Sequence, residues 1–277
     1  GGSVGGPAGE SVGGSVGGAA RESAGESVGG SGGESMGGPP GGSVGELAGG
    51  SAGSRAVEVG ALLVDMDGTV VDSSAAVTKV WTDYAAGRGL DIGQVLAFAH
   101  GRRPHETIAR FDPADPDPAA TAQRLQDQEM ALREGISPVT GARDLWHGIG
   151  GGQSGAKVAL VTSASRPLAE IRMAAAGLAM PAVAVCAEDV AAGKPAPDGY
   201  LAAARALGVA ITDCLVLEDS LAGIEAALTA GAKLIAVGGR PGGPGELGGP
   251  NRLAELPDLA GLGARVLESG RIEVTWP

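Results

Sequence analysis

The sequence predicts an α/β protein whose core is a doubly wound parallel sheet, with a small all-helical segment inserted after the first strand. Three observations support this fold class. From Lys157 onward, short runs rich in Val and Leu alternate with helical patterns, which is typical of a parallel sheet covered on both faces. Residues 75–134 contain helical patterns and no strand pattern. The apolar run at residues 59–64 predicts a buried first strand ahead of this helical segment.

The chain is predicted to consist of a tail and two domains. Residues 1–55 are dominated by Gly and Ser and have almost no large apolar side chains. Such a segment cannot bury enough apolar surface to offset the entropy lost on ordering, which predicts a disordered tail. The remainder is predicted to form a core of residues 56–74 and 136–277 and a helical cap of residues 75–135.

Within the predicted cap, apolar residues between positions 77 and 85 recur at the three-and-four spacing of a helix. Further helices are predicted over Ile92–Ala99 and residues 119–134. Residues 100–108 interrupt and restart the helical pattern. The Pro- and Asp-rich residues 112–118 predict a loop.

The predicted core elements after the cap alternate between strand and helix. Strands are predicted at Val158–Val161, residues 182–186, residues 214–217 and Lys233–Val237, and helices at residues 167–176, Asp198–Leu207 and Leu221–Ala230. The glycine-rich residues 148–155 are not followed directly by a helix, so we interpret them as a surface insertion and not as a nucleotide cradle.

Charge and composition disfavour several classes of partner. The formal net charge is −12, which disfavours nucleic acid and anionic membranes because both require a cationic surface. Apolar residues make up 43% and aromatic residues only 3%, so the core must consist mainly of Ala, Val and Leu. The two cysteines, Cys186 and Cys214, lie in apolar runs, which fits a reducing compartment. No stretch reaches the roughly 18 apolar residues of a membrane span, and we expect a soluble, cytoplasmic, monomeric protein.

The most informative stretch is Asp65-Met66-Asp67-Gly68-Thr69, which follows the predicted first strand. In open α/β sheets, ligands bind at the carboxyl ends of the strands, so Asp65 and Asp67 lie where a site is expected. Gly68 lets the backbone turn, which can give the two carboxylates separate roles. One carboxylate can attack phosphorus while the other transfers a proton. The alternative is a calcium-binding or merely solvated turn.

Three further segments place polar groups near the ends of predicted strands. Thr162 and the backbone N–H of Ser163 can donate to a phosphate oxygen, although many strands end in Thr or Ser. Lys194, between Gly and Pro, can neutralise a phosphate, whereas most lysines are simply solvated. Glu218 and Asp219 follow another strand, where paired carboxylates are costly without a hard divalent cation, although such a pair is also common at a helix start.

These four motifs, in this order, resemble those of the haloacid dehalogenase superfamily, whose members are mostly magnesium-dependent phosphatases. The resemblance covers about residues 57–240 and implies a Rossmann-like core with a helical cap that closes over the site. It implies that Asp65 is the nucleophile, forming an aspartyl-phosphate, and that Asp67 is the general acid and base.

The resemblance also implies a cofactor and its ligands. Mg²⁺ would be held by Asp65, Asp219 and the main-chain carbonyl of Asp67, with Glu218 as a further metal partner. The transferring phosphate would be bound by Thr162, Ser163 and Lys194.

Individual positions distinguish the branches of this superfamily. Its dehalogenases lack the second Asp two residues after the nucleophile, so Asp67 favours phosphoryl transfer. Its β-phosphoglucomutases, which are otherwise very similar, carry a His twelve residues after the nucleophile to suppress hydrolysis, and Val77 occupies that position here. Its phosphonatases form an imine through a cap Lys, and Lys79 lies two residues from the expected position. The sequence therefore favours hydrolysis of a phosphate ester.

The segment from residue 100 to 108 resembles bacterial sugar phosphatases of the 2-deoxyglucose-6-phosphate, hexitol phosphate and glycerol-3-phosphate type. Arg102, Arg103 and His105 are therefore predicted to contact the hydroxyls of a small phosphorylated sugar or polyol, the alternative being a solvated basic loop. The sequence is also compatible with a β-phosphoglucomutase-like phosphomutase, a phosphatase for phosphoglycolate or a nucleoside monophosphate, a phospho-accepting signalling module, and a binding protein with an inactive site.

Overall fold

The computed structural model describes residues 1–2, 45–46, 54–152, 155–238 and 249–277. The chain divides into two units, residues 1–40 and 41–277, and every element described below belongs to the second. The predicted disordered tail at residues 1–55 lies largely outside the described residues. Of it, the structure describes strand β1 (Gly45–Glu46), which pairs antiparallel with Ala56 and Arg55.

The core contains a six-stranded sheet in the order β10-β9-β8-β3-β6-β7, in which every neighbouring pair is parallel. The strand β3 lies near the centre of the sheet, between β8 and β6. The strands are β3 (Ala61–Val64), β6 (Val158–Val161), β7 (Val183–Val185), β8 (Cys214–Glu218), β9 (Lys233–Val237) and β10 (Arg252–Leu256).

Both faces of this sheet are covered, which explains why β3, β6 and β7 are apolar throughout and do not alternate. Leu62 and Val64 pack on one face with α5 (Ala142–Gly148) and α6 (Arg166–Ala176). Ala61 and Leu63 pack on the other face with α7 (Asp198–Leu207) and α8 (Leu221–Ala230). The predicted doubly wound parallel α/β fold is confirmed.

A second, antiparallel sheet was not predicted. Its order is β1-β2-β12-β11, with β2 (Arg55–Val59), β11 (Gly263–Val266) and β12 (Ile272–Trp276). The prediction of one strand over residues 59–64 was wrong, because the chain leaves this sheet at Gly60 and enters the parallel sheet at Ala61. The Gly60 N–H donates to the Asp213 carbonyl, and a Cβ at Gly60 would overlap the Asp213 carboxylate.

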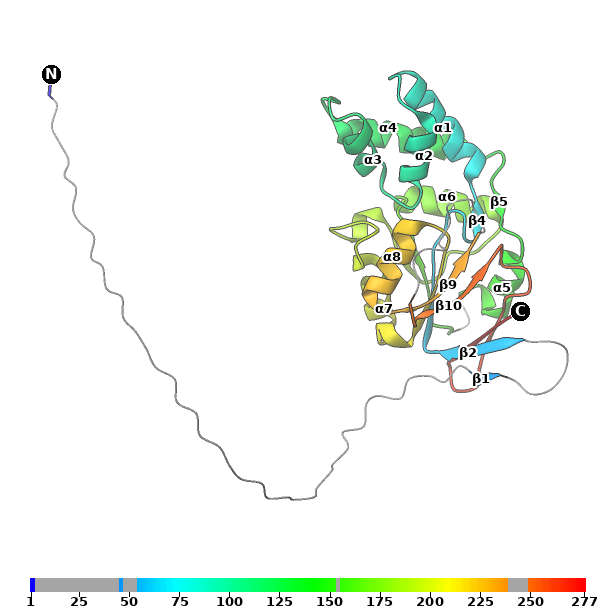
Figure 1. The fold of residues 1–277 in the computed structure, drawn as a ribbon. Coiled ribbons are helices and arrows are strands. Elements are labelled where there is room, and N and C mark those ends of the chain that lie inside the picture. Colours follow the sequence, from blue (N-terminus) through cyan, green and yellow to red (C-terminus); the bar gives the residue numbers. More distant parts are fainter. Residues whose placement is uncertain (3–44, 47–53, 153–154, 239–248) are drawn as a thin grey trace, which may run out of the picture. The chain divides into compact units, whose positions relative to one another are not determined.

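Four helices follow the first core strand: α1 (Ser74–Ala86), α2 (Ile92–Ala99), α3 (Pro104–Phe111) and α4 (Pro118–Ala131). They lie together at the top of Figure 1 and have their own apolar core, which includes Trp81, Tyr84 and Ile108. We call this group of helices the cap. The chain runs to the cap through β4 (Val71–Asp72) and back through β5 (Ser137–Pro138), which pair with each other antiparallel.

The part of the chain that the structure describes includes no helix with the length and apolar character of a bilayer span. The cytoplasmic location and the monomeric state stay predictions from the sequence.

Candidate active site

The carboxyl ends of the three central strands bring four predicted site residues together. Asp65 follows β3, Thr162 follows β6, and Asp219 follows Glu218 at the end of β8. Carboxylate oxygens of Asp65, Glu218 and Asp219 lie within 4.8 Å of one another, and all three residues are buried. Because neighbouring parallel strands end at the same edge of a sheet, residues more than 150 positions apart in sequence meet here.

Lys194 lies between two of these carboxylates. Its Nζ is 2.5 Å from Asp65 Oδ1 and 2.7 Å from Glu218 Oε2, and it also donates to the Val161 carbonyl. Burial alone would lower the pKa of Lys194, but the charges of Asp65 and Glu218 raise it above its usual value. Burial and the neighbouring Glu218 carboxylate raise the pKa of Asp65 well above its usual value, although Lys194 opposes this shift. Lys194 is therefore charged and balances part of the buried negative charge.

The Glu218 carboxylate is held by five donors, two on Oε2 and three on Oε1. Oε2 accepts from Lys194 and from the Tyr200 hydroxyl, and Oε1 accepts from the backbone N–H groups of Asp219 and Ser220 and from the Ser220 hydroxyl. Burial alone would raise the pKa of Glu218, but Lys194 and these hydrogen bonds lower it below its usual value. With its lone pairs engaged in this way, Glu218 fixes the position of Lys194.

Asp219 contacts both the core loop and the cap. Its Oδ1 accepts a hydrogen bond from Thr69, and its Oδ2 lies 2.9 Å from His100 Nε2. Gly68 has φ +89°, and a Cβ there would overlap the Asp219 carboxylate, so this loop requires glycine both for its conformation and for space. His100 was not among the predicted site residues, because only the folding of the cap over the core brings it near Asp219.

Asp67 is held at both of its carboxylate oxygens. Oδ1 accepts from the Ser73 hydroxyl at 2.7 Å, and Oδ2 accepts from Arg172 Nη1 at 2.8 Å. The other terminal nitrogen of Arg172 donates to Glu129 Oε2, also at 2.8 Å. Burial raises the pKa of Glu129 even though Arg172 opposes this shift. Arg172 and Glu129 were missed by the sequence analysis, because neither belongs to a motif.

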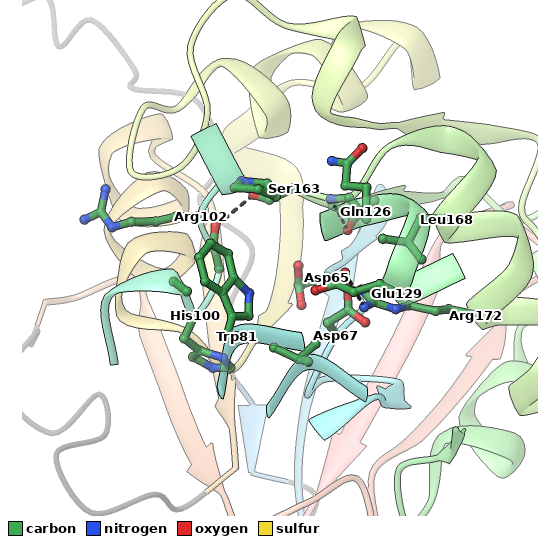
Figure 2. Close-up of a pocket in the computed structure, with 16 residues that line it drawn as sticks. Asp65, Asp67, Trp81, His100, Arg102, Gln126, Glu129, Ser163, Leu168 and Arg172 are labelled. Atoms are coloured by element: carbon green, nitrogen blue, oxygen red, sulfur yellow. Dashed lines mark hydrogen bonds and ion pairs between the residues drawn. The ribbon is translucent and has the colours of Figure 1, made fainter. Parts of the chain in front are cut away.

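A cavity opens between these carboxylates and the cap. Figure 2 shows Asp65 and Asp67 facing it, with Trp81 and His100 on one side and Glu129 and Arg172 on the other. Gln126 of the cap and Leu168 of the core also line the cavity. The cavity therefore has charged groups from the core at its base and mixed polar and aromatic groups from the cap above.

The predicted phosphate and substrate residues lie in different places. Thr162 and Ser163 line the cavity, where Thr162 Oγ1 accepts from the Ala164 N–H and Ser163 Oγ donates to the Gly101 carbonyl of the cap. Arg102 also lines it, but its guanidinium lies over the Phe98 ring and extends away from Asp65 in Figure 2.

The other two predicted cap residues lie outside the lining of this cavity. Arg103 pairs with Glu106 at 2.7 Å and donates to the Ala191 carbonyl of the core. His105 is exposed and lines a separate surface groove that also contacts Gln126. Of the three, Arg102 is the one that lines this cavity.

Comparisons with known proteins agree with this geometry. A family profile described as haloacid dehalogenase-like hydrolase matches residues 59–231. The chain is 42% identical to hexitol phosphatase A of Escherichia coli over 177 residues, which cover 63% of this chain and 81% of that protein. It is 33% identical to fructose-1-phosphate phosphatase YqaB of the same organism, with 64% and 95% of the two chains covered. The crystal structure of CbbY from Rhodobacter sphaeroides in complex with phosphate superposes with a TM-score of 0.62 at 26% identity, covering 73% of this chain and 95% of that one.

Proposed function

This chain belongs to the haloacid dehalogenase-like hydrolases, and we propose that it is a magnesium-dependent phosphatase that hydrolyses a small phosphorylated sugar or polyol through an aspartyl-phosphate on Asp65. One observation carries the proposal. Asp65, paired with the buried Lys194, and Asp67, two residues further on, face the same cavity beneath the cap. A nucleophile and a proton donor thus face one substrate phosphate, and the Lys194 ammonium lies 2.5 Å from the nucleophile.

The buried acidic groups suit a hard divalent cation. Asp65, Glu218 and Asp219 together carry more negative charge than Lys194 balances, and all three offer oxygen atoms. Asp65, Asp219 and the main-chain carbonyl of Asp67 would hold Mg²⁺, and Glu218 would support the site by orienting its neighbours. When bound, the ion supplies positive charge that offsets the repulsion between the substrate phosphate and these carboxylates.

The proposed chemistry has two steps. In the first, an Asp65 carboxylate oxygen attacks phosphorus, the bond from phosphorus to the ester oxygen breaks, and Asp67 gives its proton to that oxygen, which leaves as an alcohol. In the second, Asp67 takes a proton from a water molecule that attacks the same phosphorus, which releases inorganic phosphate and regenerates Asp65. Lys194, Thr162 and Ser163 would bind the phosphate oxygens in both steps.

The substrate class is proposed from the cap side of the cavity and from the relatives. His100, Gln126 and Glu129 offer donors and acceptors for hydroxyl groups, and Trp81 offers an apolar face. Hexitol phosphatase and fructose-1-phosphate phosphatase act, as their names state, on small polyhydroxylated phosphate esters. A polyol or sugar of similar size would match this lining.

The test is an assay of purified protein with Mg²⁺ against hexitol phosphates, fructose 1-phosphate, glycerol phosphates, phosphoglycolate and nucleoside monophosphates. We expect selective phosphate release from the sugar or polyol esters, lost after chelation and restored by Mg²⁺. Asp65→Asn should abolish turnover, whereas Asp72→Asn, an exposed Asp in the nearby β4, should retain it. Isomerisation of a hexose phosphate without phosphate release would favour the phosphomutase alternative. The absence of turnover with every ester would overturn the proposal.

A further inference from the structure

The structure contains a buried cation that the proposed chemistry does not yet use. Arg172 lies on α6 and is only 3% exposed. Its two terminal nitrogens bind two different carboxylates, Asp67 of the core and Glu129 of the cap helix α4, each at 2.8 Å. The guanidinium thus joins the proposed general acid to the cap, and Figure 2 shows all three groups at the cavity.

Packing alone does not require Arg172 to bind both carboxylates. A buried ion pair can often be replaced by apolar side chains of similar volume with little loss of stability. Here the flat guanidinium uses one terminal nitrogen for each carboxylate, so Asp67 and Glu129 together fix the plane of Arg172. Asp67 is oriented in turn, because Arg172 holds Oδ2 and Ser73 holds Oδ1.

We propose that Arg172 is a positioning residue for Asp67, and that Glu129 orients Arg172 so that proton transfer to the leaving oxygen depends on the cap being in place. This inference rests on the proposed phosphatase function. In the first step, Asp65 attacks phosphorus, the bond to the leaving oxygen breaks, and the proton moves from Asp67 to that oxygen. Arg172 touches no reacting atom and acts through the orientation of Asp67.

The test compares two leaving groups. A sugar or polyol phosphate releases an alkoxide and needs the proton, whereas p-nitrophenyl phosphate releases a stable phenolate and needs it little. Because Asp67 also serves as the base in the second step with either substrate, the comparison uses the rate of the first step, measured as leaving-group release in a single turnover with excess enzyme. We expect Arg172→Met to lower this first-step rate for the polyol phosphate by about 100-fold, a typical contribution of general acid catalysis, and for p-nitrophenyl phosphate by less than about fivefold. Glu129→Gln should show the same selective loss with a smaller size, and Arg172→Lys should lie between Arg172→Met and the wild type.

Two controls keep the test decisive. Arg166→Met removes an ion-paired arginine from the same helix, at a site 40% exposed and paired with Asp189, and should leave the first-step rate unchanged for both substrates. Because Arg172→Met leaves Glu129 buried without its partner, the double variant Arg172→Met/Glu129→Leu should restore the thermal midpoint without restoring polyol phosphate turnover.

Each other outcome overturns the inference. Equal losses of the first-step rate with both substrates would assign Arg172 to phosphate binding or to folding, and recovery of polyol phosphate turnover in the double variant would assign it to stability alone. If the wild type and Arg172→Met hydrolyse polyol phosphates equally well, the inference is refuted and the proposed function stays intact. A wild-type protein without turnover of any ester would overturn both.

Discussion

Replacement of Lys194 by Met tests the central charge arrangement independently of any substrate. Met keeps the length of the side chain and removes its charge. In the structure the ammonium lies 2.5 Å from Asp65 Oδ1 and 2.7 Å from Glu218 Oε2. At these separations and an effective dielectric constant of about 20, each pair attracts by about 6 kcal/mol before desolvation is subtracted. Because removing one partner of a buried ion pair leaves a buried charge uncompensated, we expect a net loss of about 3–5 kcal/mol in the free energy of unfolding.

The assay is urea unfolding at neutral pH without divalent ions, with Lys79→Met as the matched control. Lys79 forms an ion pair with Asp83 at 2.9 Å, but both side chains are more than 60% exposed. Exposed pairs of this kind contribute less than about 0.5 kcal/mol, so the control should unfold like the wild type. A loss below about 1 kcal/mol for Lys194→Met would refute the reasoning, because it would mean that the buried carboxylates do not depend on this ammonium.

The loss should also depend on pH. Burial and Glu218 already raise the pKa of Asp65 above its usual value of 3.8, and removal of Lys194 removes the group that opposes this shift. If the pKa of a carboxyl group is higher in the folded state than in the unfolded state, ionisation of that group destabilises the fold. The loss of stability grows as the pH rises from the pKa of the unfolded state to the pKa of the folded state. Lys194→Met should therefore cost more stability at pH 8 than at pH 5, and the opposite trend would contradict the assignment.

Three further predictions follow from single sites. Gly68→Ala should lower activity by about 100-fold, because the added Cβ would displace the Asp219 carboxylate. The control Gly89→Ala, at φ +66° with nothing within 4 Å of its Cβ, should cost about 1–2 kcal/mol of stability and leave activity unchanged, and equal activities of the two variants would contradict the prediction. Burial raises the pKa of Cys186 to about 11, so Ellman's reagent at pH 8 should react with this thiol only after unfolding, and rapid reaction in the native protein would be inconsistent with the structure. Hydrogen bonds from Arg271 lower the pKa of Asp213. Arg271→Gln should therefore lower the free energy of unfolding by about 1 kcal/mol at pH 7, and by progressively less as the pH falls through that lowered pKa, as unfolding at several pH values would show.

The sequence was sufficient for the parts of the site that lie directly after strands. Asp65, Thr162 and Asp219 each follow an apolar run, and the parallel order of those runs brings their ends together without further information. The predicted helices over Ile92–Ala99 and Asp198–Leu207 match the structure at both ends. Local pattern and global fold agree in these segments, so the residues could be placed from the sequence alone.

Other features depend on contacts that no local pattern records. Arg172 and Glu129 lie within ordinary helical patterns, and only the packing of α4 against α6 makes them partners. Tyr200 appears as an apolar residue of a buried helix until the fold brings its hydroxyl to Glu218. The strand Ile272–Trp276 did carry a signal, the alternation of apolar and polar residues, but its place in an antiparallel sheet depends on β2, which lies more than 200 positions away in sequence.

The paired strands β4 and β5 have a consequence for how this protein can diversify. Val71 lies opposite Pro138 and Asp72 opposite Ser137, so the two points at which the chain leaves and rejoins the core are hydrogen-bonded neighbours. Whatever lies between them begins and ends at the same place, so its length does not strain the strand that carries Asp65. Recombination or insertion at this ribbon can therefore exchange the cap without displacing Asp65, provided that the new cap supplies a partner for Arg172 as Glu129 does here.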